Sequence, residues 1–162
     1  MFTTRAGRPG DVPAILEFLP RLADYPLPKH RTEDMFWGSD ARLLERWGSG
    51  DAKTLQTTLV RVGVDTEDTP VAAAILTMNK CHFSEEPNGH LEVVVVSEAA
   101  DGQGLGRTLI TEMESDAAAR GAKTISLHVL GNNTRARYVY EGLGYDEEMI
   151  RAVKHLSDRD ES

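Results

Sequence analysis

Apolar residues in the first part of the chain recur at helical spacing. Asp11 stands directly before them as the expected N-cap, because aspartate is favoured at that position. Pro20 falls inside the pattern and is expected to kink or split the helix. A second helix is expected over residues 39–47, with Gly48 as its stop. The apolar face of the first helix consists of Ile15, Leu16, Leu19, Leu22 and Ala23.

Three later segments are rich in β-branched residues, which favour strands. Residues 54–65 and 71–78 are separated by a turn cluster at 65–70, so we expect them to pair as a hairpin. A polar loop is expected over residues 84–89. Residues 90–97 are the densest of the three segments and predict another strand.

The second half of the chain alternates between helical and strand patterns. A helix is expected to follow the third strand and to end at Gly121. Residues 124–130 predict a strand, and residues 134–143 predict a short helix. An extended last segment is expected from Tyr145 to residues 154–156. The apolar side of the longer helix consists of Leu105, Leu109, Ile110, Met113 and Ala117.

This order of elements predicts a single mixed α/β (α+β) domain over residues 1–156, followed by a polar tail over 157–162. The sheet is expected to be mixed and mostly antiparallel, with helices on its sides. The strand–helix–strand unit in the second half predicts one parallel pair of strands, joined by a right-handed crossover.

Composition narrows the class of protein. The chain has 162 residues, 40% of them apolar and 27% charged, which is typical of one soluble domain. The formal net charge of −8 argues against non-specific binding to nucleic acid or to an anionic membrane. The longest apolar runs are far too short to cross a bilayer. The five histidines show no metal-ligand spacing, so no metal is expected.

Cysteine usage and the N-terminus bear on the compartment. The single cysteine, Cys81, excludes an internal disulfide. Residues 1–10 contain no apolar run of the kind found in a signal peptide. We therefore expect a cytoplasmic protein.

A glycine-rich loop lies between the third predicted strand and the helix after it. Gly102, Gly104 and Gly106 alternate there, and glycine permits positive φ and close approach of a ligand. Successive N–H groups before a helix N-terminus form an anion site that suits a pyrophosphate. Arg107 stands where a G-x-G-x-x-G motif needs glycine, and the P-loop motif is absent. The loop alone leaves a diphosphate site and a ligand-free turn as alternatives.

The wider pattern resembles the GNAT superfamily of N-acetyltransferases. The glycine loop and its helix are followed by Asn133, Ala136 and the run Tyr140-Glu141-x-Leu143-Gly144-Tyr145. The resemblance is strong from His90 to Tyr145. It implies a GNAT-type fold with a splayed parallel pair of strands. It also implies direct transfer of acetyl from acetyl-CoA to a primary amine of a small molecule or peptide in a ternary complex.

The resemblance assigns roles to the backbone of the third strand. In similar proteins the strand matching residues 91–97 splays from the strand matching 124–130, and the pantetheine arm enters the gap. The resemblance implies that the backbone at Val94 and Val96 pairs with this arm. It further implies that the amide near Val94–Val95 holds the thioester oxygen in the tetrahedral intermediate. The valine side chains are expected in the core.

The resemblance also implies that the loop amides cradle the pyrophosphate. The family usually has Arg or Gln at the first position of the loop, where this chain has Asp101. We therefore expect Asp101 to contribute through its main chain only and Arg107 to supply compensating charge. On this basis Asp101→Arg should tighten acetyl-CoA binding. The residues assigned to this part of the cofactor site are Asp101, Gly102, Gln103, Gly104, Leu105, Gly106 and Arg107.

Three residues after the loop complete the implied cofactor site. Asn133 matches a family asparagine that hydrogen-bonds the pantetheine, although it would also serve as a helix N-cap. Ala136 is assigned to the same site. Tyr140 matches the tyrosine near the thioester sulfur, so its phenol is expected to protonate the departing thiolate. Its place on an apolar stripe equally fits a core tyrosine.

Glu92 is the candidate general base. It is predicted to lie on the opposite face of its strand from Leu91, Val93 and Val95. An ammonium group with a pKa of about 10.4 must lose a proton before attack, which costs roughly 4–5 kcal/mol at pH 7. A carboxylate relays that proton directly or through water. A solvated or ion-paired glutamate is the alternative.

Other readings of the sequence are weaker. Glu85, Glu86 and His128 are lesser candidates for the base, and Cys81 as a nucleophile is disfavoured because a lone cysteine at a strand end is usually inert. The rivals to an acetyltransferase are a non-catalytic acyl-CoA-binding module, a nucleotide-binding protein unrelated to CoA, and an enzyme for longer acyl groups. A homodimer through the C-terminal strands is expected by resemblance.

Overall fold

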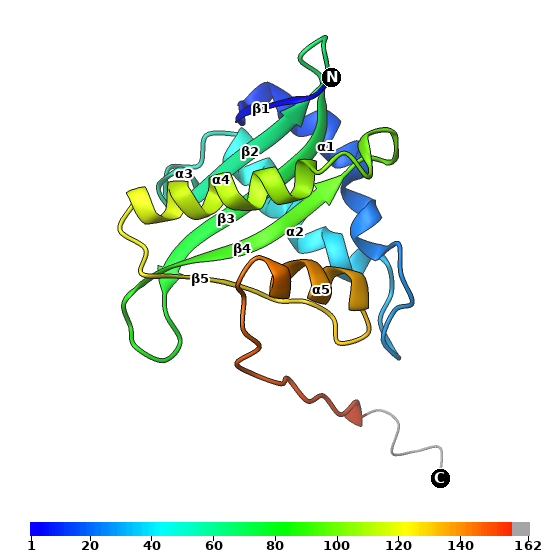
Figure 1. The fold of residues 1–162 in the computed structure, drawn as a ribbon, viewed down its shortest axis with the longest axis vertical. Helices are drawn as coiled ribbons and strands as arrows, with labels where there is room; N and C mark the ends of the chain where they lie inside the picture. Colours follow the sequence, from blue (N-terminus) through cyan, green and yellow to red (C-terminus); the bar gives the residue numbers. More distant parts are fainter. Residues whose placement is uncertain (157–162) are drawn as a thin grey trace.

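The computed structural model describes residues 1–156, which fold around a five-stranded sheet (Figure 1). The strands lie in chain order, and each pair is antiparallel except β4 with β5, which are parallel. This confirms the predicted hairpin, the parallel pair and the fold class. The strands are β1 (Thr3–Ala6), β2 (Thr58–Val64), β3 (Pro70–Lys80), β4 (Pro87–Val96) and β5 (Thr124–Leu127).

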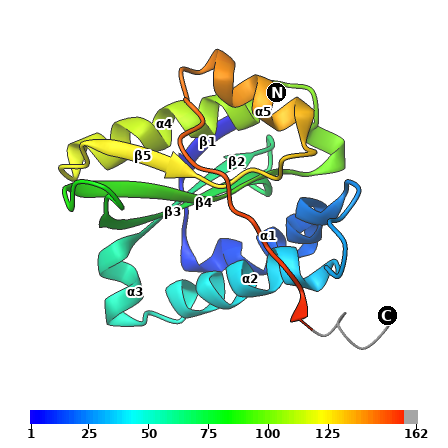
Figure 2. The same ribbon diagram turned by 90° about the horizontal axis from the view of Figure 1, so that it is seen from below.

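Helices form a layer on each face of the sheet (Figure 2). One layer contains α1 (Val12–Phe18), α2 (Asp34–Gly48) and α3 (Ala52–Thr57), and the other contains α4 (Leu105–Ala119) and α5 (Thr134–Gly142). Short 3-10 helices join these elements: η1 (Pro9–Asp11), η2 (Leu19–Ala23) and η3 (Glu98–Ala100). None of the helices within residues 1–156 has the length and apolar composition needed to span a membrane.

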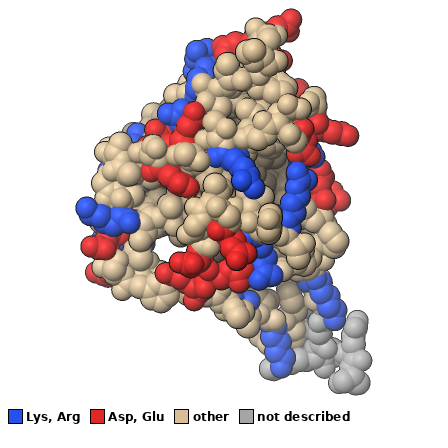
Figure 3. All heavy atoms as spheres, viewed as in Figure 1, with Lys and Arg blue, Asp and Glu red and all other residues tan. Residues whose placement is uncertain are grey.

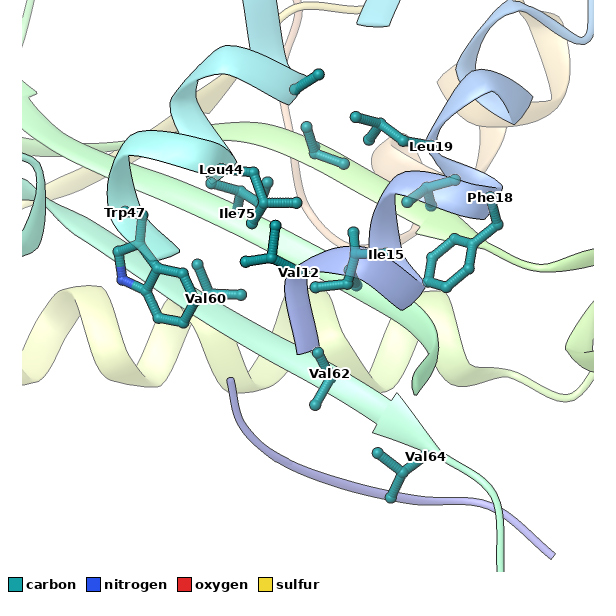
Figure 4. Packing of buried hydrophobic residues seen from close by; sticks show 14 residues of the cluster. Val12, Ile15, Phe18, Leu19, Leu44, Trp47, Val60, Val62, Val64 and Ile75 are labelled. Carbon is teal, nitrogen blue, oxygen red and sulfur yellow. The ribbon is translucent and has the colours of Figure 1, made fainter. Parts of the chain in front are cut away.

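Each face of the sheet has its own core. On the α1–α2 face, fully buried Ile15 and Leu44 pack against Val62 and Ile75 (Figure 4). On the α4 face, Leu109 and Met113 pack over small residues of β3, mainly Ala72 and Ala74. Burying one such large side chain stabilises the fold by roughly 1.5–3 kcal/mol. The two cores therefore fix the position of β4, the strand between them.

The N-terminal helix splits where Pro20 predicted it. α1 ends at Phe18 and the chain continues as the 3-10 helix η2. Asp11 precedes α1, but its side chain does not cap that helix, contrary to the prediction. Its carboxylate instead accepts two hydrogen bonds from Arg5, at 2.8 and 2.9 Å, and one from the Arg8 amide. The ion pair with Arg5 is the stronger partner for a carboxylate.

Residues 54–57 form a helix, so the predicted strand over 54–65 is wrong at its start. The carboxylate of Asp51 accepts hydrogen bonds from the Thr54 amide at 2.9 Å and from the Thr54 hydroxyl at 2.6 Å. This N-cap begins α3 and outweighs the strand preference of threonine. α2 begins at Asp34, five residues before its predicted start, and β4 begins at Pro87, inside the predicted polar loop.

The last predicted extended segment forms no strand in residues 145–156. β5 ends at Leu127, before its predicted end at 130, and no further strand pairs with it among the described residues. After α5 the chain crosses the edge of the sheet toward the α2 side (Figure 2). It reaches the loop before α2, where the His155 and His30 rings lie 4.7 Å apart. Residues 157–162 of the predicted tail lie outside the described residues.

Candidate active site

β4 and β5 pair over only part of their length. Their register joins Asn88 to Thr124 and ends where Leu91 faces Leu127. β4 then continues to Val96 while still paired with β3 on its other side. The edge of β4 over residues 92–96 therefore has no strand beside it among the described residues. We call the gap between this edge and the chain after Leu127 the fork.

A β-bulge lies at the base of the fork. Ile75 of β3 faces Val93, whereas the next residue, Leu76, faces Leu91, so Glu92 is the extra residue. The bulge reverses the side-chain alternation. Leu91 packs in the α4-side core, whereas Val93 and Val95 pack in the α1–α2 core. The prediction that these three residues share one face is therefore wrong.

The backbone of β4 presents polar groups to the fork. The Ser97 amide donates to the Val71 carbonyl at 2.7 Å, which directs the backbone groups of Ser97 toward β3. Backbone groups alternate in direction along a strand, so those of Val96 and Val94 point into the fork. The carbonyl of Val96 does accept a hydrogen bond from that side, from Nη1 of Arg21 at 2.6 Å.

The glycine loop has the backbone conformation that only glycine adopts easily. Gly102 and Gly104 have φ of 77° and 78°, in the left-handed region. Gly104 is also the N-cap residue of α4, and Leu105 anchors the first turn of that helix in the core. A Cβ on Gly106 would lie 3.7 Å from Val94, so the start of α4 sits close to the fork.

Asp101 turns its side chain into the loop. One carboxylate oxygen accepts a hydrogen bond from the Gly102 amide at 3.0 Å. The carboxylate also faces Arg21 at 3.6 Å and Arg135 of α5 at 3.7 Å. Arg107 and Gln103 are exposed. The cations near Asp101 are thus two arginines that the sequence pattern did not single out.

Basic side chains on this face form separate groups rather than one continuous patch (Figure 3). An anion at the loop would therefore depend on individual cations close to it, because charges in water are screened beyond about 8–10 Å.

The start of α5 closes the other side of the fork. Asn133 acts as the N-cap, because its Oδ1 accepts a hydrogen bond from the Ala136 amide at 3.1 Å. Asn132 donates to the Pro26 carbonyl at 2.7 Å, and the Tyr25 phenol contacts the Asn133 side chain. These contacts hold the loop after η2 against the loop before α5.

Tyr140 of α5 is largely buried among aromatic and apolar side chains. Its ring meets that of Tyr145 edge to face, with centroids 5.7 Å apart, and packs against the α4-side core. Burial, together with the nearby Tyr25 phenol, raises the pKa of Tyr140 to about 12. The phenol is therefore protonated throughout the physiological pH range. Tyr25 is a neighbour that the sequence pattern did not reveal.

Glu92 projects from the bulge toward the α2 side of the sheet. Its Oε1 accepts a hydrogen bond from the Thr77 hydroxyl at 2.6 Å. The charge of Glu92 acts electrostatically on the carboxyl group of Asp40 in α2. Burial, and then the charge of Glu92, raise the pKa of Asp40 to about 7. The carboxyl of Asp40 makes no hydrogen bond with any residue of 1–156.

The other candidate bases and the cysteine lie in different places. The His128 ring lies beside that of His90, tilted by 60° with centroids 4.7 Å apart, next to the base of the fork. Cys81, Glu85 and Glu86 lie in the turn between β3 and β4, at the far end of β4 from Val96. Among residues 1–156 no cluster of His, Cys, Asp and Glu is arranged to hold a metal ion.

Residues 20–145 match the family model described as "Acetyltransferase (GNAT) family". A mycothiol acetyltransferase from Rhodococcus erythropolis is 43% identical over 58 residues, which make up 36% of this chain and 19% of that protein. A second mycothiol acetyltransferase, from Gordonia bronchialis, is 42% identical over 62 residues, which make up 38% of this chain and 20% of that protein. The chain thus spans about a fifth of the length of these curated relatives.

Two solved structures illustrate the shared fold. An acetyltransferase from Trypanosoma brucei superposes with a TM-score of 0.69 at 20% identity, covering 96% of this chain and 100% of that one. The glucosamine-6-phosphate N-acetyltransferase from Arabidopsis thaliana superposes with a TM-score of 0.64 at 20% identity, covering 96% of this chain and 99% of that one.

Proposed function

Because this chain belongs to the acetyltransferase (GNAT) family and is an acyltransferase, we propose that it transfers acetyl from acetyl-CoA to a primary amine of a small molecule or peptide. The amine attacks directly while both substrates are bound. The observation that supports this most is the fork, where the edge of β4 over residues 92–96 has no strand beside it in the described chain and lies next to a glycine loop. The similarity to proteins named mycothiol acetyltransferases favours a small-molecule acceptor.

The residues around the fork fit acetyl-CoA. The backbone of Val94 and Val96 suits an extended amide-containing arm such as pantetheine, which would add to the sheet as a strand does. The loop from Asp101 to Gly106 provides amides for the diphosphate. Arg21 and Arg135 face Asp101 of that loop, at 3.6 and 3.7 Å, and place positive charge beside it. Asn133 and Ala136 line the far side.

Acetyl-CoA supplies an activated thioester, and the residues of this chain bind and orient it and move protons. The amide near Val94–Val95 would hold the thioester oxygen and stabilise the negative charge that develops there. A hydrogen-bond donor fixed in this way contributes about 2.7–4 kcal/mol in other acyl-transfer enzymes.

Glu92 accepts the proton of the attacking ammonium. The Thr77 hydroxyl orients one oxygen of Glu92 and leaves the other free for the amine or for a bridging water. General bases of this kind accelerate reactions by about 10²–10⁴-fold.

Tyr140 stabilises the departing thiolate. A thiol with a pKa near 8.5 and a phenol with a pKa of about 12 differ by roughly 3.5 units, so complete proton transfer in water-like surroundings would cost about 5 kcal/mol. The same burial disfavours a charged thiolate next to Tyr140 and so raises the pKa of the CoA thiol, which narrows the pKa difference between the thiol and the phenol. Tyr140 therefore donates a hydrogen bond as charge develops and transfers its proton late.

The experiment that tests the proposal is a CoA-release assay over a panel of primary amines, with Tyr140→Phe as the variant. We expect turnover to fall at least tenfold in Tyr140→Phe while acetyl-CoA binding, measured by calorimetry, persists. The alternative function is a catalytically silent acyl-CoA-binding module. Tight binding of acetyl-CoA without release of CoA from any amine would favour that alternative.

A further inference from the structure

A row of polar side chains crosses the sheet on its α1–α2 face, just beyond the apolar core. Thr58 of β2 faces Thr77 of β3, Thr77 faces His90 of β4, and His90 faces Ser126 of β5. We call these four residues the polar row. Residues two positions along, such as Val60 and Ile75, belong to the buried core of the same face. The row therefore marks the boundary where packing by α1 and α2 stops.

The row leads away from the fork to a cavity beneath α2 and α3, which cover this face of β2 and β3 (Figure 2). The cavity has a volume of about 350 Å³, and both Thr58 and Thr77 line it. Thr77 is the residue that donates to Glu92, so the cavity starts one hydrogen bond from the proposed base. Thr58 is 3% exposed, and its hydroxyl has no hydrogen-bond partner in residues 1–156.

Charge is divided between the two ends of this path. At the fork end lie Glu92 and Asp40, two carboxyl groups that repel each other electrostatically, and Asp40 has no hydrogen-bond partner in the described chain. At the cavity end lie Arg46 and Lys53, together with Asp51. Asp51 accepts hydrogen bonds from the amide and hydroxyl of Thr54 and keeps its negative charge, which interacts with both Arg46 and Lys53. Two cations against one carboxylate leave the cavity with an excess of one positive charge.

We propose that the acceptor is a primary amine that carries a carboxylate or phosphate group, with its ammonium between Glu92 and Asp40 and its anionic group in the cavity beside Arg46 and Lys53. This proposal rests on the proposed acetyl transfer and names the substrate class. An ammonium relieves the repulsion between the two carboxyl groups, and the unpartnered Thr58 hydroxyl gains a partner.

The spacing of the row sets the length of the acceptor. Thr77 and Thr58 are cross-strand neighbours, roughly 5 Å apart, and Glu92 lies one hydrogen bond beyond Thr77. The ammonium and the anionic group of the acceptor must therefore be roughly 8 Å apart or more. In an α-amino acid the nitrogen and the carboxyl carbon are less than about 3 Å apart. The proposed acceptor therefore separates its amine from its anionic group by several bonds.

Matched amines test the proposal. The acetylation of 6-aminohexanoate and 6-aminohexyl phosphate is compared with that of hexylamine and glycine, with CoA release as the readout. We expect kcat/KM to be at least tenfold higher for the two long anionic amines than for hexylamine or glycine. The better of the two anionic amines identifies the group that the cavity prefers. Equal values for hexylamine and both anionic amines would overturn the proposal.

Variants assign the preference to the cavity. In Arg46→Gln/Lys53→Gln we expect the preference for anionic amines to fall below twofold through a higher KM, with kcat for hexylamine unchanged. Arg42→Gln removes one positive charge from the exposed side of the same helix and should keep the preference. Retention of the full preference in the double variant would contradict the assignment.

A binding measurement separates this proposal from the proposed function. Titration of 6-aminohexanoate and of hexylamine into the protein, followed by calorimetry in the presence of CoA, does not depend on turnover. Tighter binding of 6-aminohexanoate that is lost in the double variant supports the anion site even if no amine is acetylated, in which case only the proposed function fails. Equal binding of the two amines overturns the anion site even if both are acetylated.

The KM and kcat of a variant at Asp40 test the role of this residue. Asp40→Asn should raise KM for each amine at least fivefold while kcat changes less than twofold, because Asp40 holds the ammonium and Glu92 removes its proton. A change in kcat alone would contradict this role.

Discussion

The two sides of β4 serve the proposed reaction with different parts of the chain. On the fork side, the proposed functional groups are mostly backbone: the strand edge at Val94 and Val96 and the amides of the glycine loop. On the α2 side they are side chains: Glu92 from a bulge, Thr77 from β3 and Asp40 from α2.

This difference explains why one side leaves a sequence motif and the other does not. A backbone site needs glycine at positive φ, and glycine at fixed spacing is visible in a sequence. A side-chain site needs only a few ordinary polar residues that the fold brings together from separate strands and helices. The cofactor site on the fork side can therefore be predicted from local sequence, whereas the acceptor site on the α2 side depends on tertiary structure.

The largest expected effect belongs to the α2 side. Glu92→Gln should lower kcat at pH 7 by at least about 100-fold, because the amide cannot accept the ammonium proton. Acetyl-CoA binding should not change, since the side chain of Glu92 points away from the α4 side. Steady-state CoA release and calorimetry measure the two quantities.

Glu86→Gln is the matched control, because Glu86 carries the same charge in the exposed turn between β3 and β4. Activity close to wild type in Glu92→Gln would remove Glu92 from proton transfer and return attention to His128 beside His90.

The sequence predicted much of the fold because its signals were local. The hairpin of β2 and β3, the crossover through α4 and the split at Pro20 each follow from periodicity or from one residue type. The bulge at Glu92 left no such sign, so simple alternation placed Leu91 on the wrong face. The sequence does not predict α3, because a run rich in threonine favours a strand and only the local cap by Asp51 favours the helix.

The site was predicted unevenly for the same reason. The loop glycines and the N-cap position of Asn133 are found where the pattern placed them. The sequence pattern did not assign Arg21, Arg135 or Asp40 to the site, and only the packing of η2, α5 and α2 around β4 brings them near. The extended segment predicted after Tyr145 formed no strand, because strand pairing depends on partners that local sequence does not specify.

The second prediction tests the backbone character of the fork side. Gly104→Ala forces a Cβ into the left-handed region, at a cost of about 1–2 kcal/mol. We expect acetyl-CoA to bind about tenfold more weakly, because the loop relaxes away from the conformation that presents its amides. The KM for the amine should stay the same. Calorimetry measures the first quantity and initial rates the second.

Gly121→Ala provides the control for strain alone. Gly121 also has positive φ, at 92°, and open space around it, but it lies at the far end of α4. It should lose comparable stability without weakening acetyl-CoA binding. Equal weakening in both variants would mean that the loop conformation has no specific role.

The third prediction concerns Asp101, whose carboxylate lies against the Gly102 amide and faces two arginines. Asp101→Asn removes a negative charge from the loop and frees Arg21 and Arg135, so acetyl-CoA should bind about three- to tenfold more tightly than in the wild type. Asp101→Arg should bind acetyl-CoA at least as tightly as Asp101→Asn does. Asp24→Asn is the control, because Asp24 also pairs with Arg21, at 3.1 Å, but lies outside the loop. Weaker binding in Asp101→Asn would mean that the carboxylate positions the arginines for the cofactor.

The smallest effect is a pH-dependent change in stability on the α2 side. Burial and the charge of Glu92 raise the folded pKa of Asp40 from 3.8 to about 7. A raised pKa means that the protonated carboxyl favours the folded state below about pH 4, and that this contribution is lost as pH rises toward 7. Asp40→Asn keeps a neutral group at every pH. The free energy of unfolding of the variant should therefore match that of the wild type near pH 4 and exceed it above pH 7 by about 1 kcal/mol, or roughly 2–4 °C in Tm, after allowance for partial exposure.

Thermal unfolding from pH 4 to pH 8 measures the difference, and Asp34→Asn, at the exposed start of α2, is the control. A difference that stays constant with pH would mean that the pKa of Asp40 is not raised in the folded protein. Neither burial under α2 nor the charge of Glu92 would then set this side of β4 apart from the fork.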